Sequence, residues 1–163
     1  MELTVGELVV YGGHGPGRVI ARETRGSGTS RHEVIVLELD GSLTVTLPVA
    51  LAHQNLRSLA TEREVATIQR TLRTSAPPSE TVWLKRHKAT REKLAAGEPI
   101  GLAEIVSDGN RRHQGDTGRL SVSERELYMR ARRLLANEIA LLRDIQPAHA
   151  DDWITTQLTH AKS

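Results

Sequence analysis

The sequence has no cysteine and no phenylalanine, and it has only two tryptophans and two tyrosines among its 163 residues. Without cysteine, the chain can form neither a disulfide framework nor a thiolate zinc site. Because phenylalanine is absent, we expect a core built almost entirely from aliphatic side chains. The sequence also lacks an apolar run of the roughly 18 residues that span a bilayer, and its start lacks the basic residues of a secretion signal. We therefore expect a cytoplasmic protein with no membrane association.

An excess of one charge is also missing, since 22 Lys and Arg residues stand against 20 Asp and Glu residues, a net charge of +2. This balance rules out a strongly cationic coat for nucleic acid. The charge is unevenly shared: residues 1–60 hold five basic and six acidic side chains, whereas residues 61–163 hold 17 and 14. The second part of the chain is therefore the better candidate for binding an anion.

The frequency of glycine changes along the chain. Eight of the 13 glycines lie within residues 1–41, and none lies between Ser42 and Ala96. This shift predicts two domains, at residues 1–58 and 61–163. Together they give an α+β fold, in which a small all-β barrel precedes an all-α bundle of about five helices.

Four β-rich runs occupy the first domain. They cover residues 8–11, 18–24, 33–39 and 43–47, and turn residues separate them. Asp40-Gly41 predicts a two-residue hairpin turn before the last run. In that run leucine or valine alternates with serine or threonine, which makes one face apolar, and Pro48 ends the strand because it has no N–H to donate. Several short strands at this spacing predict a small barrel or sandwich.

The second domain shows the 3.6-residue period of helices. The segment from Thr61 to Glu64 fits a capping box, and the segment from Ser121 to Glu124 opens the strongest helix, whose apolar stripe is typical of a bundle core. We expect Pro147 to end that helix. The other expected features are a break at Pro77-Pro78, an N-cap at Ser79, a helix end at Gly97, a helix over about residues 99–112, a loop at 115–118 and a short last helix containing Trp153.

No group of residues has the pattern of a catalytic or metal site. The Gly12–Gly17 stretch is rich in glycine like a phosphate-binding loop, but a strand follows it instead of a helix, so we interpret it as a turn between strands. The seven histidines, His14 among them, are scattered, which argues against a metal site. We interpret Asp151-Asp152 as the charged first turn of the last helix. We therefore expect no enzyme activity, no catalytic residue, no cofactor and no metal.

One basic segment differs from the rest of the chain. Residues 81–93 carry five cations and one anion beside Trp83. Cations next to an aromatic ring are typical of a nucleic-acid-binding surface. A solvated helix face whose tryptophan covers the core would have the same composition, so the residues alone leave both interpretations open. Trp153 lies among acidic residues, and we interpret it as a packing residue.

Two sets of residues together resemble a known protein family. The first set resembles the RNA-polymerase-interacting module shared by CarD-like proteins and the transcription-repair coupling factor; it contains Gly6, Val9-Val10-Tyr11, His14-Gly15, Gly17, Val19, Leu43-Thr44-Val45 and Leu47-Pro48. The second set resembles the helical domain of CarD/CdnL proteins; it contains Thr81, Trp83, Lys85-Arg86, Lys88, Glu92-Lys93-Leu94-Ala95, Gly97, Arg111-Arg112, Gln114, Leu120-Ser121, Glu124-Arg125, Ala131-Arg132 and Leu134-Leu135. The resemblance runs from about Val5 to about Leu142.

The resemblance implies a bacterial transcription regulator without enzymatic activity. In that family a Tudor-like (SH3-like) barrel binds the β subunit of RNA polymerase, and the helical domain reaches promoter DNA at the upstream edge of the melted bubble. There a tryptophan wedges into the minor groove and favours the open complex, largely independently of base sequence. Carried onto this sequence, the polymerase-binding positions are Arg25, Thr46 and Pro48. The DNA-binding positions are Trp83, Lys85, Arg86, Lys88, Arg91 and Arg125.

The sequence departs from the family at three places. Thr46 stands where the family has an arginine, Gly12-Gly13 replaces a proline-rich step, and Asp108-Gly109-Asn110 replaces an apolar and aromatic stretch. A hydroxyl cannot make the bidentate contacts of a guanidinium. One alternative is therefore a divergent paralogue that docks on RNA polymerase or a partner protein but modulates or competes. Another is an autonomous helical DNA-binding protein with residues 121–143 as its recognition helix.

We expect the chain to be a monomer.

Overall fold

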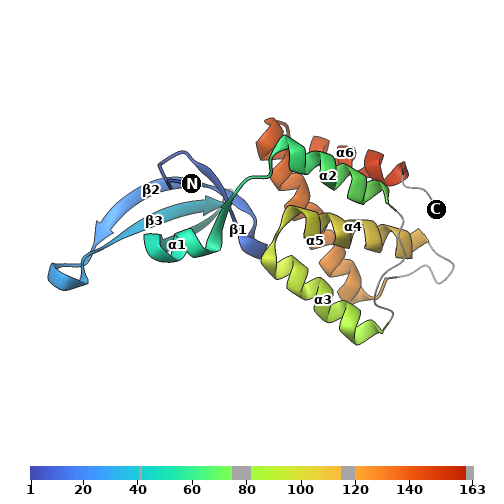
Figure 1. The fold of residues 1–163 in the computed structure, drawn as a ribbon, viewed down its shortest axis with the longest axis horizontal. Helices are drawn as coiled ribbons and strands as arrows, with labels where there is room; N and C mark the ends of the chain where they lie inside the picture. Colours follow the sequence, from blue (N-terminus) through green and yellow to red (C-terminus); the bar gives the residue numbers. More distant parts are fainter. Residues whose placement is uncertain (41, 75–81, 115–119, 161–163) are drawn as a thin grey trace. The chain divides into compact units, whose positions relative to one another are not determined.

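A computed structural model of the chain describes residues 1–40, 42–74, 82–114 and 120–160 (Figure 1). The chain divides into two compact units, Met1–Leu59 and Ala60–Ser163. The first unit is built on a β-sheet and the second on helices, which is the α+β class predicted from the sequence. None of the helices in the described ranges combines the length and the hydropathy that crossing a membrane requires.

The first unit contains a five-stranded antiparallel sheet in the order β4-β3-β2-β1-β5. Its strands are β1 (Leu8–Tyr11), β2 (Pro16–Arg25), β3 (His32–Leu39), β4 (Leu43–Pro48) and β5 (Leu56–Ser58). Helix α1 (Val49–Asn55) joins β4 to β5 and contacts both of them and β3. In Figure 1, β2 and β3 form a long hairpin with the short 3₁₀ turn η2 (Gly28–Ser30) at its tip.

One face of this sheet carries the core of the first unit. Ile35, Leu37 and Leu39 lie on the same face of β3, because side chains alternate along a strand, and all three are buried. Ala52 of α1 is also fully buried in this core. The other buried members are Leu3, Val9, Val19, Leu47 and Leu56. The prediction of an aliphatic core is confirmed in this unit.

The predicted strands are present, and their ends differ from the prediction by at most two residues. The Gly12–Gly17 stretch spans the turn from β1 to β2, as predicted, and includes the 3₁₀ turn η1 (Gly12–His14). The prediction of a two-residue turn after β3 is wrong: Leu39 pairs with Leu43, so residues 40–42 connect the strands. Gly41 lies outside the described residues. The sequence did not predict β5 or α1, since a three-residue strand is too short to show a periodic pattern.

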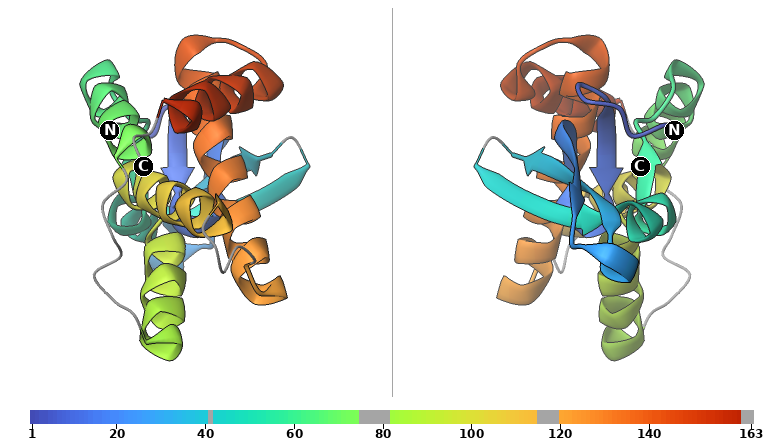
Figure 2. Two further views of the ribbon diagram at one scale, coloured as in Figure 1. Left: turned by 90° about the vertical axis from the view of Figure 1, so that its right-hand side faces the viewer. Right: turned by 90° about the vertical axis from the view of Figure 1, so that its left-hand side faces the viewer.

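Within the described residues, the second unit has five helices, which agrees with the predicted number. They are α2 (Glu62–Arg73), α3 (Trp83–Ala96), α4 (Pro99–Gln114), α5 (Val122–Arg143) and α6 (Pro147–Thr159). Helix α5 contacts α3, α4 and α6, and α2 packs on α4 and α6. In Figure 2, α3 and α6 lie on opposite sides of α4.

The core of the second unit forms around the apolar stripe of α5. Ala131, Leu134 and Leu135 are buried there, as the helical period predicted. The other helices contribute further aliphatic side chains, including Val65, Ile68, Leu72, Leu94, Leu102, Val106, Ile154 and Leu158. Trp153 is partly buried against this core, and the guanidinium of Arg143 lies 5.2 Å from the centre of its ring. The interpretation of Trp153 as a packing residue is therefore confirmed.

The predicted ends of helices α2 and α3 agree with the structure in part. The capping box of Thr61 and Glu64 is present at the start of α2, and Gly97 ends α3 at φ 68°, as predicted. Helix α3 begins later than predicted, after the N-cap Val82, and the predicted N-cap Ser79 lies outside the described residues. The break at Pro77-Pro78 and the loop at 115–118 also lie outside them.

Two predictions about the C-terminal helices are wrong. Pro147 does not end α5: that helix ends at Arg143, where Asp144 takes a left-handed conformation (φ 54°), and Pro147 begins α6. Asp151 does not lie in the first turn of α6, which holds no acidic residue. Its carboxylate binds Arg132 of α5 instead, with 2.6 Å between Oδ1 and Nε, a pairing that local sequence signals cannot reveal.

Candidate functional site

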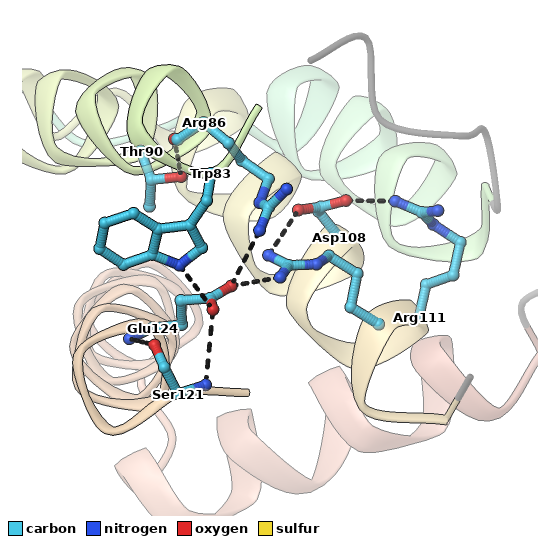
Figure 3. A network of polar contacts seen from close by, with 8 residues as sticks. Trp83, Arg86, Thr90, Asp108, Arg111, Ser121 and Glu124 are labelled. Carbon is cyan, nitrogen blue, oxygen red and sulfur yellow. Dashed lines mark hydrogen bonds and ion pairs between the residues drawn. The ribbon is translucent and has the colours of Figure 1, made fainter. Parts of the chain in front are cut away.

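Trp83 is the first residue of α3, and two side chains contact its ring, of which Figure 3 shows Glu124. Its indole Nε1 donates a hydrogen bond of 3.0 Å to Oε1 of Glu124 on α5. One face of the ring stacks on His87, one helical turn further along, with 4.8 Å between the ring centres and 10° between the planes. Even so, 41% of the residue remains exposed. The structure thus presents an aromatic ring to solvent in a fixed orientation.

Glu124 connects this ring to the helices around it. Its side chain is only 12% exposed, and its second oxygen, Oε2, forms ion pairs with Arg112 and, at 3.7 Å, with Arg86. Burial by itself raises the pKa of Glu124, but the hydrogen bonds from Trp83 and Arg112 and the positive charge of Arg112 outweigh it and lower the pKa. The carboxylate is therefore ionised at neutral pH.

The ion pairs continue from Glu124 into α4. Arg112 lies 3.9 Å from Oδ2 of Asp108, and Asp108 also pairs with Arg111. Figure 3 shows the carboxylates of Asp108 and Glu124 facing guanidinium groups. Asp108 belongs to the segment that departs from the family pattern. Its carboxylate forms an ion pair with Arg112, which also forms an ion pair with Glu124.

A hollow lies beside the ring, between α3, α4 and α5. Its apolar lining includes Ile105, Leu120, Leu127 and Tyr128, and its charged lining includes Arg86, Asp108, Arg112 and Glu124. Trp83 borders this hollow with part of its ring still exposed to solvent. Val82 and Leu84, on either side of Trp83, are exposed, and so is Val122 at the start of α5. The sequence did not predict a role at this site for these three apolar residues or for Glu124.

The predicted phosphate-binding cations lie in different places on α3 and α5. Lys85, Lys88 and Arg91 are exposed on α3, but at about 100° per residue Lys85 and Lys88 lie about 200° and 140° around the helix from Trp83. Arg86 is half-buried and faces Glu124. Arg125 is exposed on α5, directly after Glu124. The structure therefore places Arg86 among the ion pairs of Glu124. The other predicted cations lie on the surface: Lys85, Lys88, Arg91 and Arg125.

The predicted polymerase-binding residues share one face of the sheet in the first unit. Arg25 pairs with His32, Thr46 with Val36 and Pro48 with Val34, and these partners alternate along β3 with the core residues. The three residues therefore lie on the face opposite the core. The side chain of Arg25 is 53% exposed, and its Nη2 lies 3.2 Å from Oε2 of Glu23. Thr46 offers a neutral hydroxyl on the exposed edge strand β4.

The described residues hold no cluster of three or more histidine or carboxylate side chains that could bind a metal ion. They do hold an aromatic ring, Trp83, that is partly exposed and anchored by a hydrogen bond in the helical unit. Residues 3–60 match the model of the CarD-like/TRCF RID domain, and residues 67–155 match the model of the CarD C-terminal domain.

These matches define a CarD-like RNA-polymerase-interacting transcription factor, and both matched families are interaction domains associated with transcription. The chain belongs to the CarD family. Both halves of the resemblance found in the sequence are therefore confirmed at the level of the family.

Proposed function

We propose that the chain binds the β subunit of RNA polymerase through the first unit and stabilises the open promoter complex through Trp83. The observation that carries this proposal is the state of Trp83: its N–H and one face of its ring are held by Glu124 and His87, yet 41% of the residue remains exposed. A ring held in this way loses little conformational entropy when it binds, because it is already oriented.

The ring acts because it binds open DNA more tightly than closed DNA. Stacking of a base on an aromatic side chain contributes about 1–3 kcal/mol, and this contact is available only where bases are unpaired or splayed. A protein that binds the open state more tightly than the closed state shifts the melting equilibrium by that difference. No chemical step is needed.

Surface cations supply the remaining affinity for DNA. Lys85, Lys88, Arg91 and Arg125 are exposed and are proposed to contact phosphates, which gives a salt-dependent and largely sequence-independent attraction. Arg86 was predicted to act in the same way, but its guanidinium faces Glu124. We assign it to the support of the ring.

Docking on the polymerase is proposed for the outer face of the sheet, which carries Arg25, Thr46 and Pro48. Arg25 is exposed and can form charge-assisted hydrogen bonds with a carboxylate of the partner. Thr46 can donate a single hydrogen bond from its hydroxyl, but its side chain is neutral and cannot form the bidentate ion pair of a guanidinium. This favours one second candidate function, a factor that docks more weakly or elsewhere and competes with a principal CarD protein.

The structure disfavours an autonomous DNA-binding protein that reads bases with α5. From Ala131 to Ala140, seven residues of this helix are buried in the core: Ala131, Leu134, Leu135, Ala136, Glu138, Ile139 and Ala140. This burial is typical of a helix in a bundle core.

One experiment separates the two candidate functions. Open complexes of purified RNA polymerase on a promoter fragment are challenged with a competitor, and their half-life is measured with and without the full chain. A longer half-life supports stabilisation of the open complex. An unchanged or shorter half-life, with the chain bound to the polymerase, supports the competing factor. A chain that does not bind the polymerase contradicts both.

A further inference from the structure

We propose that Glu124 is a positioning residue that sets the orientation in which Trp83 is presented. This inference rests on the proposed function of Trp83 and adds the residue that controls it. Glu124 lies 41 residues further along the chain, on another helix, yet it accepts the hydrogen bond of the indole N–H. At the first position of α3, few neighbours in the same helix surround the ring. His87 of the same helix contacts one face of the ring, and the hydrogen bond to Glu124 fixes the direction of its N–H.

The carboxylate is itself fixed by groups from three helices. Arg112 of α4 and Arg86 of α3 pair with Oε2, which leaves Oε1 directed toward the indole. Asp108 holds Arg112 from its other side. The backbone N–H of Ser121 reaches Oε1 at 3.4 Å, as part of the capping box of α5. A side chain held by so many partners can hold another one in turn.

The hydrogen bond to Glu124 also decides what the ring offers to a ligand. The indole N–H is already used by Glu124, so the exposed part of the ring is apolar carbon. Such a surface can stack or wedge, but it cannot read a base by donating a hydrogen bond. The network therefore makes the contact of Trp83 with DNA tolerant of base sequence.

The chain supplies a closely matched control for removing Glu124. Glu64 occupies the same position of a second capping box, at the start of α2, where its side chain accepts hydrogen bonds from Thr61. Glu64→Ala removes a cap in the same way as Glu124→Ala, but it leaves the indole hydrogen bond intact. The difference between the two variants isolates the positioning role from helix capping.

The direct test observes the indole itself in the full chain. The ¹⁵N-labelled protein has two indole N–H resonances, and Trp83→Phe identifies that of Trp83. In Glu124→Ala, we expect the Trp83 resonance to shift and its proton to exchange faster with water, while that of Trp153 stays in place. Neither resonance should change in Glu64→Ala. An unchanged Trp83 resonance in Glu124→Ala overturns the proposal.

The functional test compares three variants by the half-life of the open complex. Glu124→Ala should lose most of the effect that Trp83→Ala loses, and the double variant should lose no more than Trp83→Ala alone. A normal half-life in Glu124→Ala beside a reduced one in Trp83→Ala also overturns the positioning role. If Trp83→Ala has no effect, the proposed function fails, and the indole resonance still decides whether Glu124 positions the ring.

Discussion

Arg132 of α5 binds Asp151 of α6 through two nitrogens: Nε lies 2.6 Å from Oδ1, and Nη2 lies 3.2 Å from Oδ2. The same guanidinium donates to the hydroxyl of Tyr128 at 3.1 Å. Burial by itself lowers the pKa of Arg132, but the hydrogen bonds with Asp151 and Tyr128 outweigh it and raise the pKa. This pair joins the last helix to the centre of the helical unit.

Removing the carboxylate should therefore destabilise the helical unit. In Asp151→Ala, the half-buried Arg132 is left without its charged partner, and we expect the free energy of unfolding to fall by about 1–3 kcal/mol. Urea denaturation of the full chain measures this change. Asp152→Ala is the control, because Asp152 is exposed and accepts a hydrogen bond from Thr156 only through its backbone. Equal destabilisation of the two variants would show that the ion pair contributes nothing.

Two glycines in α4 should respond in opposite ways to alanine. A Cβ at Gly109 would lie 2.4 Å from Cδ2 of Tyr128, so Gly109→Ala should cost about 1–3 kcal/mol through overpacking. A Cβ at Gly101 would meet only side-chain carbons of Lys93, at 3.8 and 3.9 Å, so Gly101→Ala should stabilise by roughly 0.5–1 kcal/mol. Thermal unfolding of both variants tests this. If Gly109→Ala proves as stable as Gly101→Ala, the close packing of α4 on α5 is incorrect.

The close packing at Gly109 lies in a segment where the sequence departs from the pattern that its resemblance to the family implies. That resemblance implies an apolar and aromatic stretch where this chain has Asp108-Gly109-Asn110. Here Tyr128 of α5 approaches Gly109 and fills this place with an aromatic ring from another helix. The sequence shows only the missing side chain, because the replacement comes from a residue 19 positions away.

Docking on the polymerase should depend on the charge at position 46. Thr46→Arg should strengthen binding of the chain to RNA polymerase by about tenfold, or ~1.4 kcal/mol, because a guanidinium can make the bidentate contacts that a hydroxyl cannot. Arg25→Glu should weaken it. Thr44→Arg is the control, since Thr44 lies exposed on the same strand and the same face, two residues away. An equal gain in Thr44→Arg would reveal general electrostatic attraction instead of a defined contact.

The exposed lysines of α3 should set the salt dependence of DNA binding. If Lys85 or Lys88 neutralises one phosphate, replacing that lysine by alanine should make the slope of log K against log salt shallower by about 0.9. Binding of the full chain to a DNA fragment with a melted bubble measures this slope. Lys93→Ala is the control, because its amine lies 3.3 Å from a carboxylate oxygen of Glu104. If Lys85→Ala and Lys88→Ala leave the slope unchanged, these lysines do not bind phosphate.

The sequence predicts much of the fold, because most of its signals are local. The alternation in β4, the period of α5 and the capping box at Thr61 each lie within a few residues. The partner of Asp151 depends on a contact between distant segments, and the sequence did not predict it.

The same limit applies to the candidate site. The resemblance pointed to Trp83 and to the cations near it in sequence. It did not show that Arg86 faces inward or that Lys85 and Lys88 lie on a different side of α3 from the ring. Nor did it single out Glu124, which matched the family pattern only as part of a helix start. Partners of a side chain are set by tertiary packing, which a single sequence does not show.

The central claim is that an anchored Trp83 stabilises the open promoter complex. The most direct test is the half-life of open complexes formed with Trp83→Ala, compared with the unchanged chain and with Met129→Ala, which removes another exposed apolar side chain from the same unit. Removing a stacking interaction of about 1–3 kcal/mol should shorten the half-life by roughly 5- to 150-fold, with polymerase binding unchanged. A half-life equal to that of the unchanged chain would contradict the account.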